Sequence, residues 1–109
     1  MKVFDVIPSG VKAVAVFTRG SKFEKNKDGI GSTGNWKIDH NRNLEKVIIY
    51  HRPEREPQAE VHVADITQIK PSGEEGRFII FFENREKVGD TDLNWFEFAE
   101  SGSNPVRYL

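Results

Sequence analysis

The chain has 109 residues, of which 37% are hydrophobic and 30% charged, and its formal net charge is −1. This length suits one domain with a single modest core, and the composition is typical of a folded soluble protein rather than a disordered one. The absence of cysteine excludes disulfides, a thiolate nucleophile and a cysteine-ligated zinc site. No apolar run approaches the roughly 20 residues that cross a bilayer, so we expect a cytoplasmic protein without membrane contact.

Positive charge is concentrated in the first half of the chain. Residues 1–55 carry eleven Lys and Arg against six Asp and Glu, whereas residues 56–109 carry five against eleven. A basic edge on an acidic body is compatible with nucleic-acid binding, although a basic patch is more often a solvated surface. The charge pattern therefore leaves both interpretations open.

Five apolar or β-branched runs predict short strands. In chain order, the expected strands are residues 11–19, 36–39, 46–52, 60–69 and 77–83. Several of these runs are apolar on both faces, as expected for strands that are covered on each side. The alternation of the fourth run changes phase near Asp65, which predicts a bulge or a strong bend.

Polar and glycine-rich segments separate the expected strands. Residues 21–34 predict a long connection, and the prolines of residues 53–58 predict an exposed turn. Another turn is expected at residues 71–73 and a polar loop at residues 84–92. Residues 93–99 predict a short helix with an apolar stripe, and an alternating strand is the other interpretation.

These elements indicate a mainly β (α+β) fold. The chain has no internal repeat and no low-complexity segment, so residues 1–109 are expected to form a single domain. Short, closely spaced strands with little helix predict a small curled sheet or barrel of five to six strands, with one or two short helices.

The glycine-rich segment does not carry a complete phosphate-binding or nucleophile motif. Gly29, Gly31 and Gly34 match the spacing G-x-G-x-x-G, but no strand–helix–strand unit surrounds them. The stretch GIGSTGNWK lacks the lysine that a P-loop requires, and GSTG is not the G-x-S-x-G of a serine nucleophile. A glycine-rich approach that brings the backbone close to a ligand remains as the functional interpretation.

The three histidines do not have the spacing of metal ligands, because His40, His51 and His62 lie eleven residues apart. His51 and His62 fall in neighbouring expected strands, where one sheet face could bring them together. Such histidines are more often exposed or structural. We therefore expect a protein that is not an enzyme and that uses no metal or cofactor. A small-molecule-binding or hydrolytic barrel that uses His51 and His62 is a third interpretation.

Aromatic residues beside hydrogen-bonding groups favour base recognition. Trp36 follows the glycine-rich segment, Tyr50 lies near Arg52, and Trp95 follows Asn94. Aromatic faces stack on flipped or single-stranded bases while neighbouring polar groups read the base edge. The competing interpretation is that both tryptophans fill the core, and the core is favoured for Trp95.

Residues 44–84, LEKVIIYHRPEREPQAEVHVADITQIKPSGEEGRFIIFFEN, resemble the central portion of PUA-like domains, especially the EVE type, which is related to ASCH and YTH modules. The resemblance depends mainly on VIIYHR followed by VHVADITQI. It implies a barrel-like sheet of five or six strands with short flanking helices. It also implies binding of nucleic acid, often through a modified base that is extruded into an aromatic cage.

We therefore predict a nucleic-acid-binding domain, for DNA or RNA, that reads a modified or flipped base between the glycine-rich loop and Tyr50. The alternative is a protein-interaction or homodimerising accessory domain without catalytic activity. The predicted stacking residues are Trp36, Tyr50 and Trp95, the predicted edge-reading residues are Ser32, Thr33 and Asn35, and the predicted phosphate contacts are Arg19, Lys22, Lys25, Lys27, Lys37 and Arg52.

Overall fold

The computed structural model describes residues 7, 10–19, 23–25, 29–52, 59–91 and 106–108. Its elements are strands β1 (Ala13–Arg19), β2 (Phe23–Lys25) and β3 (Gly31–Trp36), the 3-10 helix η2 (His40–Arg42), and strands β4 (Lys46–Arg52), β5 (Ala59–Pro71), β6 (Phe78–Thr91) and β7 (Val106–Tyr108). The predicted helix at residues 93–99 and the predicted turn at residues 53–58 lie outside the described residues. Within the described part, no helix is long and apolar enough to span a membrane.

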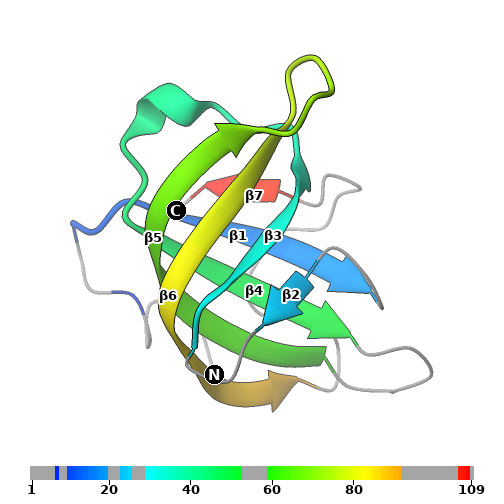
Figure 1. Ribbon diagram of the computed structural model, residues 1–109. Coiled ribbons are helices and arrows are strands. Elements are labelled where there is room, and N and C mark those ends of the chain that lie inside the picture. Colours follow the sequence, from blue (N-terminus) through cyan, green and yellow to red (C-terminus); the bar gives the residue numbers. More distant parts are fainter. Residues whose placement is uncertain are drawn as a thin grey trace.

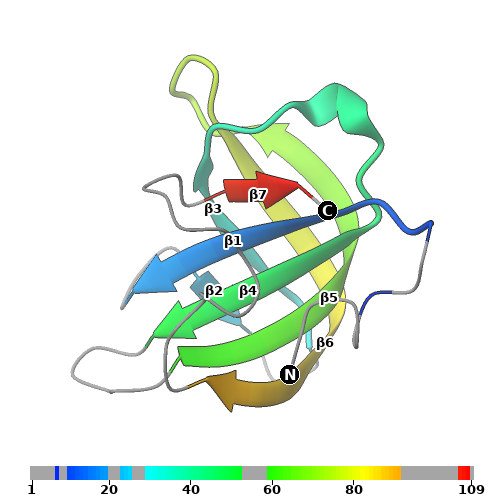
Figure 2. The same ribbon diagram turned by 180° about the vertical axis from the view of Figure 1, so that it is seen from behind.

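The strands form one mixed sheet in the order β2-β3-β6-β5-β4-β1-β7. β1 and β4 are parallel, and every other neighbouring pair is antiparallel. The sheet curls strongly on itself, as Figures 1 and 2 show from opposite sides. Among the described residues β2 and β7 do not pair with each other, so the hydrogen-bonded sheet is open. The mainly β prediction is confirmed, whereas a closed barrel is not seen.

The long β5–β6 hairpin gives the sheet its curvature. Its register shifts three times, between Val61 and His62, between Val63 and Asp65, and between Ile66 and Gln68. On the opposite strand Asn84 has a left-handed backbone, with φ of 53°. Bulges of this kind bend a strand and increase its twist. The predicted irregularity near Asp65 is therefore confirmed.

The bend divides the sheet into two halves. The β4 half consists of β7, β1 and β4 with residues 59–65 and 83–91 of the hairpin, since β4 pairs with β5 only as far as Asp65. The β3 half consists of β2 and β3 with residues 66–71 and 78–82, since β3 pairs with β6 only as far as Phe82.

Two apolar clusters stabilise this arrangement. The inner cluster lies between the two halves and contains Val14, Val16, Trp36, Ile38, Val47, Ile49, Ala64, Ile80 and Phe82. The outer cluster lies on the opposite face of the β4 half and contains Ile7, Ala13, Ala15, Ile48, Tyr50 and Val61. Successive residues of β1 and β4 alternate between the two clusters, so the prediction that the strand at residues 11–19 is covered on both faces is confirmed.

Three segments that were expected to be loops are strands. Residues 23–25 form β2 and residues 31–34 belong to β3 rather than to a connection, and residues 84–91 continue β6. Conversely, the strand expected at residues 36–39 ends at Trp36. At Gly34 an added Cβ would lie 3.0 Å from Cγ1 of Ile79, so the missing side chain lets β3 approach β6 closely. Pairing with a neighbouring strand thus overrides the weak intrinsic β propensity of these residues.

Candidate nucleic-acid interface

Trp36 belongs to the inner cluster and is only 3% exposed. Its Nε1 donates a hydrogen bond to Oγ1 of Thr33 at 3.0 Å, and Thr33 is itself buried. The indole N–H of Trp36 and the hydroxyl of Thr33 are therefore hydrogen-bonded to each other in the interior. The predicted stacking role of Trp36 and edge-reading role of Thr33 would require the core to open, because both side chains are buried.

Tyr50 is fully buried in the outer cluster, where its ring stacks on Phe17 with centroids 4.9 Å apart. Burial raises the pKa of the Tyr50 phenol well above its ordinary value. Tyr50 and Trp36 lie on opposite faces of the sheet, so they cannot form one cage. This corrects the predicted pocket between the glycine-rich segment and Tyr50. Trp95 lies outside the described residues.

The two predicted phosphate contacts whose side chains the structure describes, Lys37 and Arg52, do not lie in one patch. Lys37 is exposed and follows β3 at the end of the sheet where Trp36 pairs with Phe78. Arg52 is half-buried and ends β4 at the opposite end, paired with Arg19. The side chains of Arg19 and Lys25 lie outside the described part of the structure, as do Lys22 and Lys27 entirely.

Asn35 has a structural role at the tip of the β3 half. Its Nδ2 donates to Oε2 of Glu74 at 2.6 Å, and its backbone oxygen accepts a bond from Nη1 of Arg77 at 3.1 Å. Both partners belong to the turn between β5 and β6, which begins at the predicted Pro71–Gly73 position. Asn35 therefore attaches β3 to this turn, an arrangement that does not require a base as its partner.

Ser32 lies on a surface that sequence analysis missed. Ile80 and Phe82 point into the inner cluster, so Ile79 and Phe81 point outward from the β3 half. Phe81 is flanked across the sheet by Ser32 and Gln68, whereas Ile79 is flanked by Gly34 and Lys70. We call the outward surface formed by Ser32, Gly34, Gln68, Lys70, Ile79 and Phe81 the Phe81 face.

The Phe81 face is partly open to solvent. Phe81 and Ile79 are half-buried, and Gln68 and Lys70 are exposed. Nζ of Lys70 lies 5.7 Å from the centre of the Phe81 ring, within the range of a cation–π contact. Residues 78–82 are all apolar, so the sequence contained no signal that distinguished the outward Phe81 from the inward Phe82.

A second group of polar residues lies on the inner face of the β4 half. His51 and His62 share this face, as the sequence suggested, because His62 pairs with the inward Ile49 two residues before His51. His51 Nδ1 and Thr18 Oγ1 are hydrogen-bonded. Thr18 is only 2% exposed, so its hydroxyl is not accessible as a nucleophile.

His62 is held between a carboxylate and a guanidinium. Nη1 of Arg85 lies 2.9 Å from Nδ1 of His62, and Oε1 of Glu60 lies 3.0 Å from Nε2. Because a guanidinium can only donate, Nδ1 must accept and the imidazole proton is on Nε2, facing Glu60. His62 is therefore a neutral, buried connection between β5 and β6. Among the described residues, no group of three His, Cys, Asp or Glu is arranged to hold a metal ion.

Three comparisons with known proteins found no match for this chain. No protein-family model matches the chain, and neither a curated protein nor a solved structure matches it.

Proposed function

We propose that this protein is a non-catalytic, PUA-like binding domain that holds single-stranded nucleic acid on its Phe81 face. The observation that carries this proposal is the half-buried Phe81 ring at the centre of an outward sheet surface, with Lys70 at 5.7 Å and the small residues Ser32 and Gly34 on the adjacent strand. An aromatic ring on a sheet, with low side chains beside it, leaves room for a base to stack.

Polar groups on both sides of Phe81 and a lysine on one side support a nucleic-acid ligand. Ser32 and Gln68 lie directly across from Phe81 on its two neighbouring strands and can donate to or accept from a base edge. Lys70 lies on β5, at one edge of this surface. A strand of nucleic acid that crosses the face would thus meet a lysine on its β5 side.

The open sheet favours a base laid flat on the surface over a base flipped into a cage. Trp36 and Tyr50, which were expected to form such a cage, are at most 3% exposed. One stacked base contributes about 1–3 kcal/mol in single-strand binding proteins. With few cations near Phe81, we expect weak binding at low salt that decreases as salt is added.

Fluorescence anisotropy with labelled single-stranded DNA and RNA at low salt tests the proposal. Phe81→Leu keeps an apolar side chain but removes the aromatic face, and it should weaken binding at least about fivefold. Val88→Ala, at a half-buried position of the β4 half, is the matched control and should leave affinity unchanged. Lys70→Gln should reduce the slope of log affinity against log salt by about 0.7. Absence of binding by the unaltered protein at tens of micromolar would defeat the proposal.

Protein interaction on the same surface is the second candidate. Ile30, directly before β3, is 50% exposed, and with Ile79 and Phe81 it adds apolar surface of the type found in protein interfaces. Light scattering separates the two candidates. A dimer that persists at high salt, dissociates in Ile30→Glu and has no affinity for oligonucleotides would favour the interaction domain.

A further inference from the structure

A groove lies on the β4 half, away from the Phe81 face. It has a volume of about 440 Å³ and is lined mainly by Lys46, Val63, Asp65, Asn84, Glu86 and Val88. These residues come from β4, β5 and β6 where the hairpin bends. The volume lies within the range of small-ligand sites.

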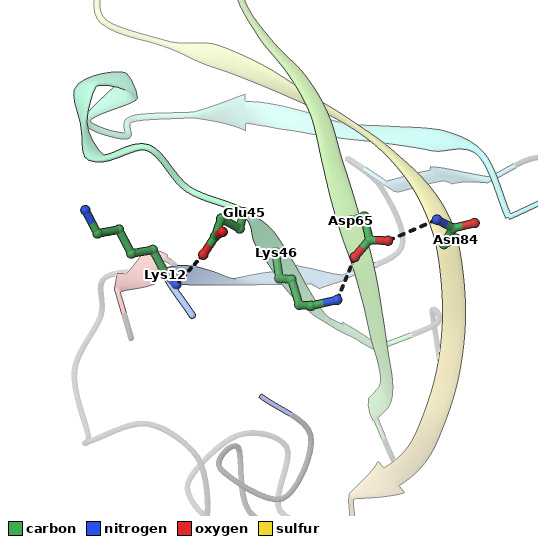
Figure 3. Close-up of polar contacts among 5 residues, drawn as sticks. All are labelled: Lys12, Glu45, Lys46, Asp65 and Asn84. Carbon is green, nitrogen blue, oxygen red and sulfur yellow. Dashed lines mark hydrogen bonds and ion pairs between the residues drawn. The ribbon is translucent and has the colours of Figure 1, made fainter. Parts of the chain in front are cut away.

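Three of the residues that line the groove form a hydrogen-bonded polar triad, shown in Figure 3. Nζ of Lys46 lies 2.6 Å from Oδ1 of Asp65, and Nδ2 of Asn84 donates to Oδ2 of Asp65 at 2.9 Å. The hydrogen bond from Lys46, followed by that from Asn84, lowers the pKa of the Asp65 carboxyl. Lys46 and Asp65 therefore neutralise each other, and their pair leaves no net charge in the groove.

Glu86 gives the groove its net charge. It is exposed on β6 and pairs with Val63 across the sheet, one residue pair from the bend. With Lys46 and Asp65 balanced, the carboxylate of Glu86 leaves the lining with one negative charge. Within the described part of the chain, no ion pair joins Glu86 to a cation.

The amide of Asn84 adds a directional acceptor. Its Nδ2 is committed to Asp65, so the carbonyl oxygen of the same amide is available to accept a hydrogen bond. Val63 and Val88 are half-buried and provide apolar walls beside these polar groups. A carboxylate, a carbonyl acceptor and two aliphatic walls together complement a cation that is carried on a hydrocarbon chain.

We propose that this groove binds a primary ammonium group on a short aliphatic chain. The ammonium donates to the Glu86 carboxylate and to the carbonyl oxygen of Asn84, and the methylene groups pack against Val63 and Val88. An anionic ligand of the same length is disfavoured, because Glu86 would repel it. The same chemistry occurs in a free alkyl amine and in the lysine side chain of a peptide.

NMR titration of the isotope-labelled protein tests the proposal. We expect n-butylamine to shift the amide signals of residues around Val63, Glu86 and Val88, whereas butyrate at equal concentration and pH should leave them unchanged. Glu86→Gln should weaken n-butylamine binding about fivefold. Glu75→Gln, which removes the same charge in the exposed β5–β6 turn, is the control and should bind as the unaltered protein does.

Further arms of the titration identify the source of the ammonium. Tighter binding of Nα-acetyl-lysine amide than of n-butylamine would assign the groove to a lysine side chain, and the reverse order would assign it to a free alkyl amine. Equal binding of butyrate and butylamine would overturn the proposal, as would an unchanged affinity in Glu86→Gln.

Discussion

The two halves of the bent sheet share β5 and β6 but differ in how their outer faces are covered. In the β4 half, Ala15, Ile48, Tyr50 and Val61 point outward and are at most 3% exposed, and Ile7 packs among them. In the β3 half, the outward residues of β6 are half-buried and those of β5 are exposed. Around these residues the outer face of the β4 half is therefore core, whereas the outer face of the β3 half is surface.

This difference shows that an apolar strand does not determine its own burial. Val61 and Phe81 are both apolar, both belong to the same hairpin and both point outward, yet Val61 is fully buried and Phe81 is not. What differs is the chain that packs over them, which includes Ile7 for the β4 half. The partly open aromatic ring on the β3 half is the reason that we place the proposed nucleic-acid surface there.

The largest expected effect contrasts the inward Trp36 with the outward Phe81. Trp36→Ala should reduce the free energy of unfolding by about 3–5 kcal/mol, because it empties a large volume in the inner cluster. Phe81→Ala should cost about 1 kcal/mol. Urea unfolding followed by circular dichroism measures both. Equal losses would show that the Phe81 face is covered like the outer cluster.

The next effect concerns the histidines of the β4 half. His62→Ala should reduce the free energy of unfolding by about 2–3 kcal/mol, since it leaves Arg85 and Glu60 without their common partner in a buried site. His51→Ala should cost only about 1 kcal/mol, because His51 is half-buried. The same urea experiment ranks them, and a larger loss for His51→Ala would contradict the assigned tautomer network.

Tyr50 should make the stability fall at high pH. Burial raises the pKa of its phenol in the folded state. The neutral phenol therefore contributes its full stabilisation of the folded state below the ordinary pKa of 10.0, and this stabilisation is lost as the pH rises above that value. At pH 11 the loss should be about 1 kcal/mol. Tyr50→Phe removes this dependence, and the difference between the two unfolding curves across pH 9–11.5 isolates it. Parallel curves would place the phenol in solvent.

The smallest effect is expected at the bend between the halves. Asp65→Asn should reduce the free energy of unfolding by about 0.5 kcal/mol, because the side chains of Lys46 and Asp65 are 31% and 41% exposed. The pKa of Asp65 is lowered in the folded state, so its contribution is present above about pH 4 and disappears as the pH falls through the lowered value. A double-mutant cycle with Lys46→Met at pH 7 and pH 2.5 measures this coupling. A coupling that is unchanged at pH 2.5 would contradict the ion pair.

Sequence reasoning succeeded where local pattern and burial agree. The run KVIIYHR coincides with β4, and the runs at residues 11–19 and 60–69 lie within or around β1 and β5. The prediction of strands failed for β3, whose residues GSTGN have low β propensity, and for the charged second half of β6. Those segments are strands because β6 and β5 offer them backbone partners, and a single segment does not carry that information.

The candidate site was harder to predict than the fold. A bulge between Gly34 and Trp36 sets which residues of β3 face inward, and it places Trp36 in the inner cluster. A shift of one residue moves every side chain of a strand to the other face. Of the predicted base-reading residues that the structure describes, only Ser32 contributes to the proposed Phe81 face, and the aromatic residue of that face is one that the sequence did not single out.

By itself, the sequence determined that this protein is rich in strands, lacks cysteine chemistry and has a strand irregularity near Asp65, because composition and alternation act locally. Only the tertiary structure decided which aromatic rings are core and which are surface. That outcome depends on register, on bulges and on the segments that cover each face, which are set by contacts between residues far apart in the chain.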